Sequence, residues 1–247
     1  TDFNTDTLTL APQGGWSILS SAYPHPLSDG AGITYHDKKL YVLTGTTGDT
    51  TTTREYYDIT NKRWVTIDGP PTGRGPSPQI LAGDHIYFLA DQRWRRFSVV
   101  DNTYEDITGG NSIETYTSVP TLGATPQQVY IFGEGIQRIS TADAVISNLS
   151  SMAPPTSYTG GAVACTSKDL GLITLYGGGT SEMWQIKNAS PSPTATPPVV
   201  TSVYAPGFTM ISPAVQYSNA MFVGTTTPGN VPTITQGIRI ATSLRPI

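Results

Sequence analysis

A short apolar stretch that ends in small or turn-forming residues recurs five times along the 247-residue chain. The stretches are LYVLTG (40–45), IYFLAD (86–91), VYIFGE (129–134), ITLYGG (173–178) and AMFVGT (220–225). Their starts are separated by 46, 43, 44 and 47 residues. A period of this length that carries several short strands is the sequence signature of β-propeller blades. The recurrence therefore predicts a ring of repeated units.

Each stretch is expected to be the second strand of a four-stranded unit. A β-like run such as GAGITYHD precedes it, a third run such as REYYDIT follows, and a fourth, such as RWVTI, completes the first four units. No window of a dozen residues keeps helical apolar spacing without Gly or Pro. The 25 Gly and 20 Pro residues suit many tight turns. The sequence therefore predicts an all-β fold.

The fifth unit lacks a fourth strand at the C-terminus, and a matching run occurs at the other end of the chain. GGWSILSSAYPHP (14–26) matches KRWVTIDGPPTG (62–73), yet it precedes the first unit. We therefore expect a five-bladed propeller in one domain, closed by an N-terminal strand at 14–20 that covers an otherwise open sheet edge. The first twelve residues either pair outside that strand or replace the C-terminal run as third strand. The expected blades are 28–67, 68–107, 108–149, 150–204, and 205–247 together with 14–20.

The motifs inside these units resemble the kelch repeat family. That family has an aromatic-containing second strand ending in a Gly pair, then a Tyr, then a Trp before the Pro-rich connection to the next blade. The first unit carries Tyr41, Tyr57 and Trp64 in that order, and ITLYGG supplies Gly177 and Gly178. The resemblance covers nearly the whole chain, with degenerate Gly pairs in the other units. It implies a kelch-like propeller with fewer blades than is usual in that family.

In such a blade the second-to-third connection and the blade-to-blade connection lie on one side, which we call the long-loop side. Here that set is long and varied, with expected loops at 45–53, 68–77, 177–182 and 224–236, whereas turns such as HDKK and TNKR are short. Binding residues often lie in variable loops on a rigid scaffold. The candidate ligand contacts on this side are Tyr23, His25, Arg74, Arg93, Trp94, Glu134, Tyr158 and Tyr204.

Three of these candidates are tyrosines in Pro-rich connections. Tyr23, Tyr158 and Tyr204 occur in SAYPHP, PPTSYTG and VYAPGF. An aromatic ring can stack on the apolar face of a sugar while polar neighbours bind its hydroxyls. The alternative is that these tyrosines pack between blades. Both interpretations place aromatic side chains near the connections.

The charge pattern argues against nucleic acid as a partner. Charged residues make up 13% of the chain and the net charge is −4, so no general basic field exists. Arg93, Arg95 and Arg96 stand close in DQRWRRF, but alternate strand residues point to opposite faces. We expect a solvated, partly paired strand there.

No apolar run approaches the roughly 18 residues of a membrane-spanning helix, so no membrane span is expected.

Most residues that a catalytic or metal site would need are missing. Some kelch-like propellers resemble galactose oxidase, whose copper site needs two His, two Tyr and a Cys bonded to one Tyr. Here His36 and His85 fall in hairpin turns, and Cys165 is expected to be a buried structural thiol. Glu105 and Asp106 are adjacent in a strand and face opposite ways, which is poor geometry for a glycosidase pair. We expect no catalytic residue, metal or cofactor, although residues from several blades can still converge.

Two N-glycosylation acceptor triplets begin at Asn148 and Asn188, both in loop-like positions. The second opens NASPSPTATPP, a Ser/Thr/Pro-rich stretch of the kind that carries O-linked sugars. With the low charge content, these features favour a secreted or cell-surface glycoprotein over a cytosolic protein.

Three functional hypotheses follow, in order. The first is a non-catalytic recognition module that binds glycans or a partner protein through the long-loop side. The second is a protein-interaction scaffold resembling intracellular kelch adaptors, whose binding face is lined with repeated Arg and Ser; Arg74 and Arg93 are the available arginines. The third is a carbohydrate-active or oxidase-like enzyme.

Overall fold

The computed structural model describes seven segments with their side chains and, beyond residue 149, the backbone of seven strands. The seven segments are 23–25, 32–45, 53–69, 77–90, 92–109, 120–133 and 135–149. In these parts of the chain the regular structure consists of strands and turns, with no helix. The prediction of an all-β fold is confirmed.

The described strands form five sheets, in which successive strands pair antiparallel. Sheet 1 contains β1 (Thr34–His36), β2 (Lys39–Val42), β3 (Thr53–Asp58) and β4 (Arg63–Asp68). Sheet 2 contains β5 (Gln79–Ala82), β6 (His85–Ala90), β7 (Arg93–Ser98) and β8 (Tyr104–Asp106). Sheet 3 contains β10 (Thr121–Thr125), β11 (Gln128–Phe132), β12 (Ile136–Ser140) and β13 (Val145–Asn148), with β9 (Thr108–Gly109) at its edge. Sheet 4 contains β14 (Ala162–Ser167), β15 (Leu172–Gly177), β16 (Met183–Lys187) and β17 (Val199–Tyr204). Sheet 5 contains β18 (Met210–Tyr217), β19 (Ala220–Thr226) and β20 (Pro232–Arg239).

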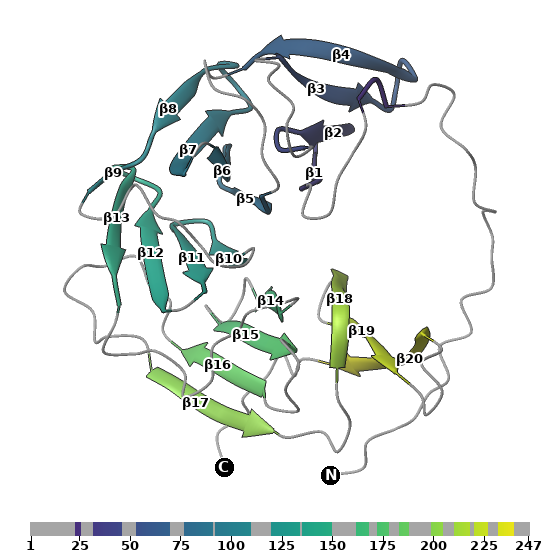
Figure 1. Cartoon of the computed structure of the whole chain (residues 1–247), viewed down its shortest axis with the longest axis vertical. Helices are drawn as coiled ribbons and strands as arrows, with labels where there is room; N and C mark the ends of the chain where they lie inside the picture. The colour runs from purple at the N-terminus through teal and green to yellow at the C-terminus, as the bar shows by residue number, and fades with distance from the viewer. Residues whose placement is uncertain are drawn as a thin grey trace.

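The sheets lie side by side in chain order around a common centre (Figure 1). The first strand of each sheet is innermost, and β4, β8, β13 and β17 lie on the outside. Contacts between inner strands follow the same order, from β1 to β5, β10, β14 and β18. The described part of the chain therefore contains five sheets that follow one another in chain order.

Sheet 3 departs from the predicted four-stranded unit because the linker from sheet 2 adds a strand to it. β9 pairs in parallel with β13, with Thr108 opposite Val145 and Gly109 opposite Ile146. Gly109 has a φ of 116°, and a Cβ there would lie 2.6 Å from the carbonyl oxygen of Ile146. Glycine is needed at this position because any side chain would collide with the β13 backbone.

Sheet 5 also differs from the prediction. The expected loop at 224–236 is wrong, since β19 runs to Thr226 and β20 already begins at Pro232. The Thr and Ile residues of PTITQGIR are β-formers, and their backbone extends the ladder beyond GIRIATS, the run expected to form the strand. The predicted closing strand at 14–20 lies outside the described residues.

Side-chain alternation makes sheet 2 bury both of its faces. In β6, Ile86 and Phe88 pack with Tyr41 and Leu43 of sheet 1. Tyr87, between them in sequence, points the other way into a second cluster, shared with sheet 3. A strand buried on both faces reads as a near-continuous apolar run, which explains why HIYFLA shows no polar alternation.

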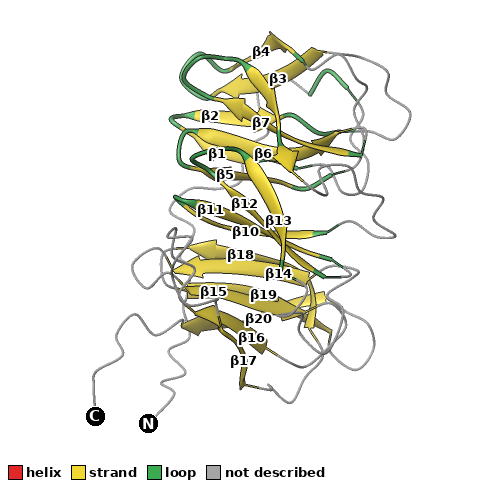
Figure 2. Cartoon of the chain, turned by 90° about the vertical axis from the view of Figure 1, so that its left-hand side faces the viewer, coloured by secondary structure: helices red, strands yellow, loops and turns green. Residues whose placement is uncertain are grey.

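The two hairpin turns of each of the first three sheets are joined by one backbone hydrogen bond. The donors and acceptors are Ile59 N to Lys38 O at 2.9 Å, Val99 N to Asp84 O at 3.0 Å and Thr141 N to Gln127 O at 3.0 Å. In the edge-on view these turns lie on one side of the sheets (Figure 2). This repeated bond fixes the lengths of both turns.

The second-to-third connections at the other end of the sheets vary in length. They span 43–52 in sheet 1, 91–92 in sheet 2 and 133–135 in sheet 3. The long loop predicted after β2 is therefore present, whereas the next two connections are tight.

Gln79 of β5 joins the inner strands of sheets 1 and 2. Its Oε1 accepts a hydrogen bond from Leu43 N at 3.0 Å, and its Nε2 donates to Thr34 Oγ1 and Tyr41 O, both at 2.9 Å. Gly32 lies against this residue, and a Cβ at Gly32 would lie 2.7 Å from the backbone nitrogen of Gln79. The hydrogen-bonded approach of the two sheets therefore depends on glycine at position 32.

Candidate functional site

Residues 23–25 bring two predicted ligand contacts onto sheet 1. Tyr23 donates its hydroxyl to Glu55 Oε2 at 3.0 Å, and His25 Nε2 lies 3.1 Å from Glu55 Oε1. The Glu55 side chain is 2% exposed and that of His25 is 27% exposed. Both oxygens of one buried carboxylate are thus engaged by a single short segment, drawn in purple beside β3 in Figure 1.

Aromatic rings hold the same segment in place. The Tyr23 ring meets Trp64 edge-on, with centroids 4.7 Å apart and planes at 63°. Trp64 in turn meets Tyr57 at 5.2 Å and 61°. Such edge-to-face pairs are favourable beyond the apolar area they bury. We call Tyr23, His25, Glu55, Tyr57 and Trp64 the Glu55 cluster.

The strand register explains why the cluster forms. Tyr57 and Trp64 are directly opposite each other on β3 and β4, and Glu55 lies two residues before Tyr57, on the same face. Tyr56 points to the opposite face, against the cluster shared with sheet 2. Glu55 pairs with Val42, the last residue of β2, so it lies toward the long-loop end of the sheet.

Corresponding positions in the next two sheets behave differently. Arg95 and Gln137, like Glu55, stand three residues before the end of the third strand. Arg95 Nε donates to Asp106 Oδ1 at 2.7 Å, and Gln137 Nε2 donates to Asn148 Oδ1 at 3.1 Å, each within its own sheet. In sheet 1 the partners come instead from the segment that precedes the sheet.

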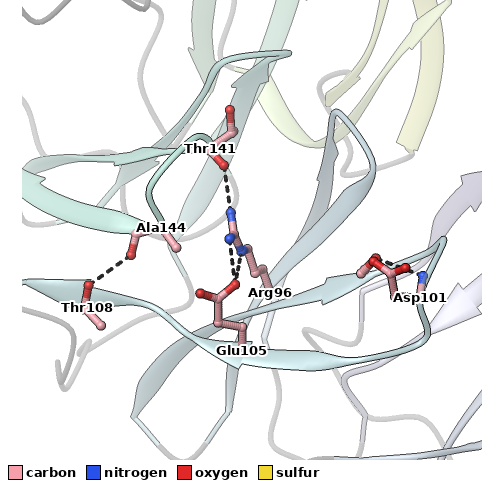
Figure 3. A network of polar contacts seen from close by, with 7 residues as sticks. Arg96, Asp101, Glu105, Thr108, Thr141 and Ala144 are labelled. Carbon is pink, nitrogen blue, oxygen red and sulfur yellow. Dashed lines mark hydrogen bonds and ion pairs between the residues drawn. The ribbon is translucent and has the colours of Figure 1, made fainter.

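The arginines of β7 are largely structural. Arg96 binds Glu105 Oε2 through Nε at 2.7 Å and donates from Nη1 to the carbonyl oxygen of Thr141 at 2.7 Å (Figure 3). Because Thr141 belongs to the β12–β13 turn, this side chain ties sheet 2 to sheet 3. The guanidinium side chain is 12% exposed.

The expectation of a partly paired arginine strand is confirmed, whereas the expectation that it is solvated is wrong for Arg95 and Arg96. The Arg95 side chain is 6% exposed, because the close approach of sheets 1 and 2 covers it. Glu105 and Asp106 bind different arginines on opposite faces, as predicted. Arg93, the first residue of β7, is exposed.

Trp94 does not lie on the surface as predicted. It is fully buried in the core cluster between sheets 2 and 3, with Tyr87 and Val129. The alternation of β7 points position 94 toward sheet 3, so its ring is not available to a ligand on the long-loop side.

The remaining predicted residues are placed only in part. Tyr204 is the last residue of β17, and its side chain lies outside the described part of the structure. Asn148 is exposed, but it ends strand β13 and is not in a loop. Arg74, Glu134, Tyr158 and Asn188 lie outside the described residues.

The two histidines predicted to lie in hairpin turns are strand residues that flank those turns. His36 ends β1 and His85 begins β6. Burial lowers the pKa of His85, and the nearby positive charge of Arg96 lowers it further. Within the seven side-chain segments, no three His, Cys, Asp or Glu residues are grouped so as to hold a metal ion.

Burial also keeps an inner-strand phenol neutral. It raises the pKa of Tyr41 to about 12, with smaller contributions from Tyr56 and Asp37.

No helix in the described portion of the chain has the length and apolarity needed to cross a membrane.

Comparison with known proteins bears on the fold alone. No family model matches the chain, and no curated protein matches it. It is similar to a solved structure described as "Structure of YjhT", with a TM-score of 0.58 and 10% sequence identity. The similarity covers 82% of this chain and 73% of that one. At this identity the match supports a common arrangement of sheets and says nothing about activity.

Sequence reasoning missed Glu55. REYYDIT was interpreted only as a third strand, although it places a carboxylate two residues before Tyr57 on the same strand face. Strand alternation places Glu55 on a buried face, and a buried carboxylate requires partners. This position could have identified Glu55 as a site residue.

Proposed function

We propose that this chain is a non-catalytic recognition module that binds glycans, or a partner protein, on the long-loop side. The observation that carries the proposal is the convergence of Tyr23 and His25 on Glu55. A partly exposed imidazole beside aromatic rings suits a ligand with apolar faces and hydroxyl groups.

We further propose that the five sheets are the blades of a closed, kelch-like propeller in which residues 14–20 complete sheet 5. The support is the path of the linkers. After β8, the outer strand of sheet 2, the chain runs onto sheet 3 at Thr108. Residues 23–25 likewise follow the predicted strand 14–20 and lie on sheet 1. The kelch resemblance is supported by Tyr41 and Tyr57, which are buried.

The alternative, an intracellular-type kelch scaffold, would need arginines free to bind a partner. Arg54 and Arg95 are buried, and Arg96 bridges two sheets. Of the two arginines named for this alternative, Arg93 is exposed and Arg74 lies outside the described residues. The exposed acceptor Asn148 supports the proposal of a secreted or cell-surface glycoprotein.

A glycan array tests the proposal with matched variants. His25→Ala and Tyr23→Ala should lose glycan binding, while His36→Ala, which changes a histidine at the end of β1 in the same sheet, should bind like the wild type. Equal binding by all variants would place the site elsewhere. If the wild type binds no glycan, cross-linking in a secretory extract tests the partner-protein arm.

A further inference from the structure

Glu55 constrains the chemistry of His25. An ionised carboxylate can only accept hydrogen bonds. Tyr23 donates to Oε2, so the 3.1 Å contact between His25 Nε2 and Oε1 requires a proton on Nε2. A neutral imidazole carries one ring proton, and its second nitrogen is then an acceptor. With Nε2–H toward Glu55, that acceptor is Nδ1.

We infer that Glu55 is a positioning residue that fixes His25 in the Nε2–H tautomer and so presents Nδ1 as an acceptor for a ligand hydroxyl. The ligand part of this inference rests on the proposed glycan-binding function. The inference predicts that a sugar hydroxyl donates a hydrogen bond to Nδ1, next to the Tyr23 ring in the same segment.

Burial makes the positioning effective. Glu55 is almost completely covered, whereas the His25 side chain is partly exposed. Hydrogen bonds to a charged group are about twice as strong as neutral ones. The edge contact of Tyr23 with Trp64 holds the backbone of the segment independently of the carboxylate.

The comparison between sheets supports a dedicated role for this carboxylate. The corresponding Arg95 and Gln137 are satisfied by cross-strand partners in their own sheets. Glu55 is opposite Thr66 on β4, yet its carboxylate oxygens reach Tyr23 and His25.

For a neutral imidazole, one competing arrangement fits the same heavy-atom distances. A protonated Glu55 would donate from Oε1 to His25 Nε2, and the ring proton would sit on Nδ1. The ring would then offer a donor to the ligand where the inferred state offers an acceptor. The tautomer of His25 distinguishes the two arrangements directly.

The experiment is ¹⁵N NMR of the imidazole rings in the full chain, near pH 8, well above the ordinary histidine pKa of about 6.5. The chain has 3 histidines, and a His25→Gln spectrum assigns the signal. The wild type should show protonated Nε2 and unprotonated Nδ1. Glu55→Gln should shift the ring toward Nδ1–H, because the Gln amide can donate to Nε2, and Glu55→Ala should give a mixture of tautomers.

Glu105→Gln is the matched control, since Glu105 is an exposed carboxylate that binds Arg96 and should leave His25 unchanged. Near-UV circular dichroism of each variant checks that the Tyr and Trp packing is intact. A wild-type Nδ1–H tautomer, or a tautomer that Glu55→Gln leaves unchanged in a folded protein, overturns the inference.

Methyl glycosides of the common hexoses then probe the acceptor. A shift of the Nδ1 resonance that is lost in Glu55→Gln supports the ligand part. If the tautomer depends on Glu55 but no glycoside moves Nδ1, the positioning role stands and the ligand contact is overturned, while the glycan array tests the glycan function separately.

Discussion

Replacing Gly32 with alanine should weaken the contact between sheets 1 and 2. The new Cβ would lie 2.7 Å from the backbone nitrogen of Gln79, closer than real Cβ atoms approach other heavy atoms. The β5 backbone must therefore shift, which also strains the three hydrogen bonds of the Gln79 side chain. Overpacking costs about 1–3 kcal/mol, and each weakened hydrogen bond costs up to about 1 kcal/mol. We expect a loss of roughly 2–4 kcal/mol in the free energy of unfolding.

Gly135 supplies the matched control. A Cβ at that position would meet no atom within 4 Å, and neither glycine has a positive φ. Gly135→Ala should therefore change stability by less than about 0.5 kcal/mol or stabilise slightly, because alanine restricts the unfolded chain. Urea unfolding followed by circular dichroism measures both variants. A Gly32→Ala variant as stable as Gly135→Ala would show that the two sheets do not approach as closely as described.

A double variant locates the strain. Gln79→Ala removes the hydrogen-bonding side chain but leaves the backbone nitrogen in place. Gly32→Ala combined with Gln79→Ala should cost less than the sum of the single changes, because both disturb the same contacts. Strict additivity would contradict the shared cause.

Four further predictions follow from the packing, the linkers and the charges. Trp64→Ala should cost on the order of 3 kcal/mol in chemical denaturation; no effect would mean that the Glu55 cluster does not hold sheet 1. Removal of residues 1–20 should lower the melting temperature of the whole domain, whereas an unchanged melting curve would contradict a closing strand. The fold lowers the pKa of His85. Its contribution to the free energy of unfolding should therefore be complete above about pH 6.5 and should decrease as the pH drops from that value toward the lowered pKa. His85→Gln should remove this part of the pH dependence of the urea midpoint. Mass spectrometry of protein from its native host should find a hexose-bearing peptide at Asn188, and a fully unmodified Asn188 would count against secretion.

The strand order was predictable because buried sheets leave a strong local signal. Runs such as HIYFLA and QVYIF are apolar on both faces, and their recurrence is enough to locate the second strands in the sequence. The N-terminal start of β20 was missed because Gly237 lies within PTITQGIR and resembles a turn residue. Backbone pairing outweighed that local preference.

The candidate site was harder to predict because it depends on contacts across the sequence. Tyr23 and His25 were nominated from their loop, but their partner Glu55 is 30 or more residues away. Trp94 was misplaced because it was assigned to the long-loop side, whereas the burial of a residue depends on which sheet lies beside its face of the strand. Local composition does not contain that information.

The backbone hydrogen bond that couples paired turns, from Ile59 N to Lys38 O and its two counterparts, bears on how such a chain can diversify. One inserted residue adds about 3.3 Å of extended backbone, enough to separate donor from acceptor and disturb both hairpins at once. The connections at 43–52, 91–92 and 133–135 already differ severalfold in length. Evolution, or a protein engineer grafting a peptide, can therefore lengthen one rim of the molecule while the other keeps its dimensions.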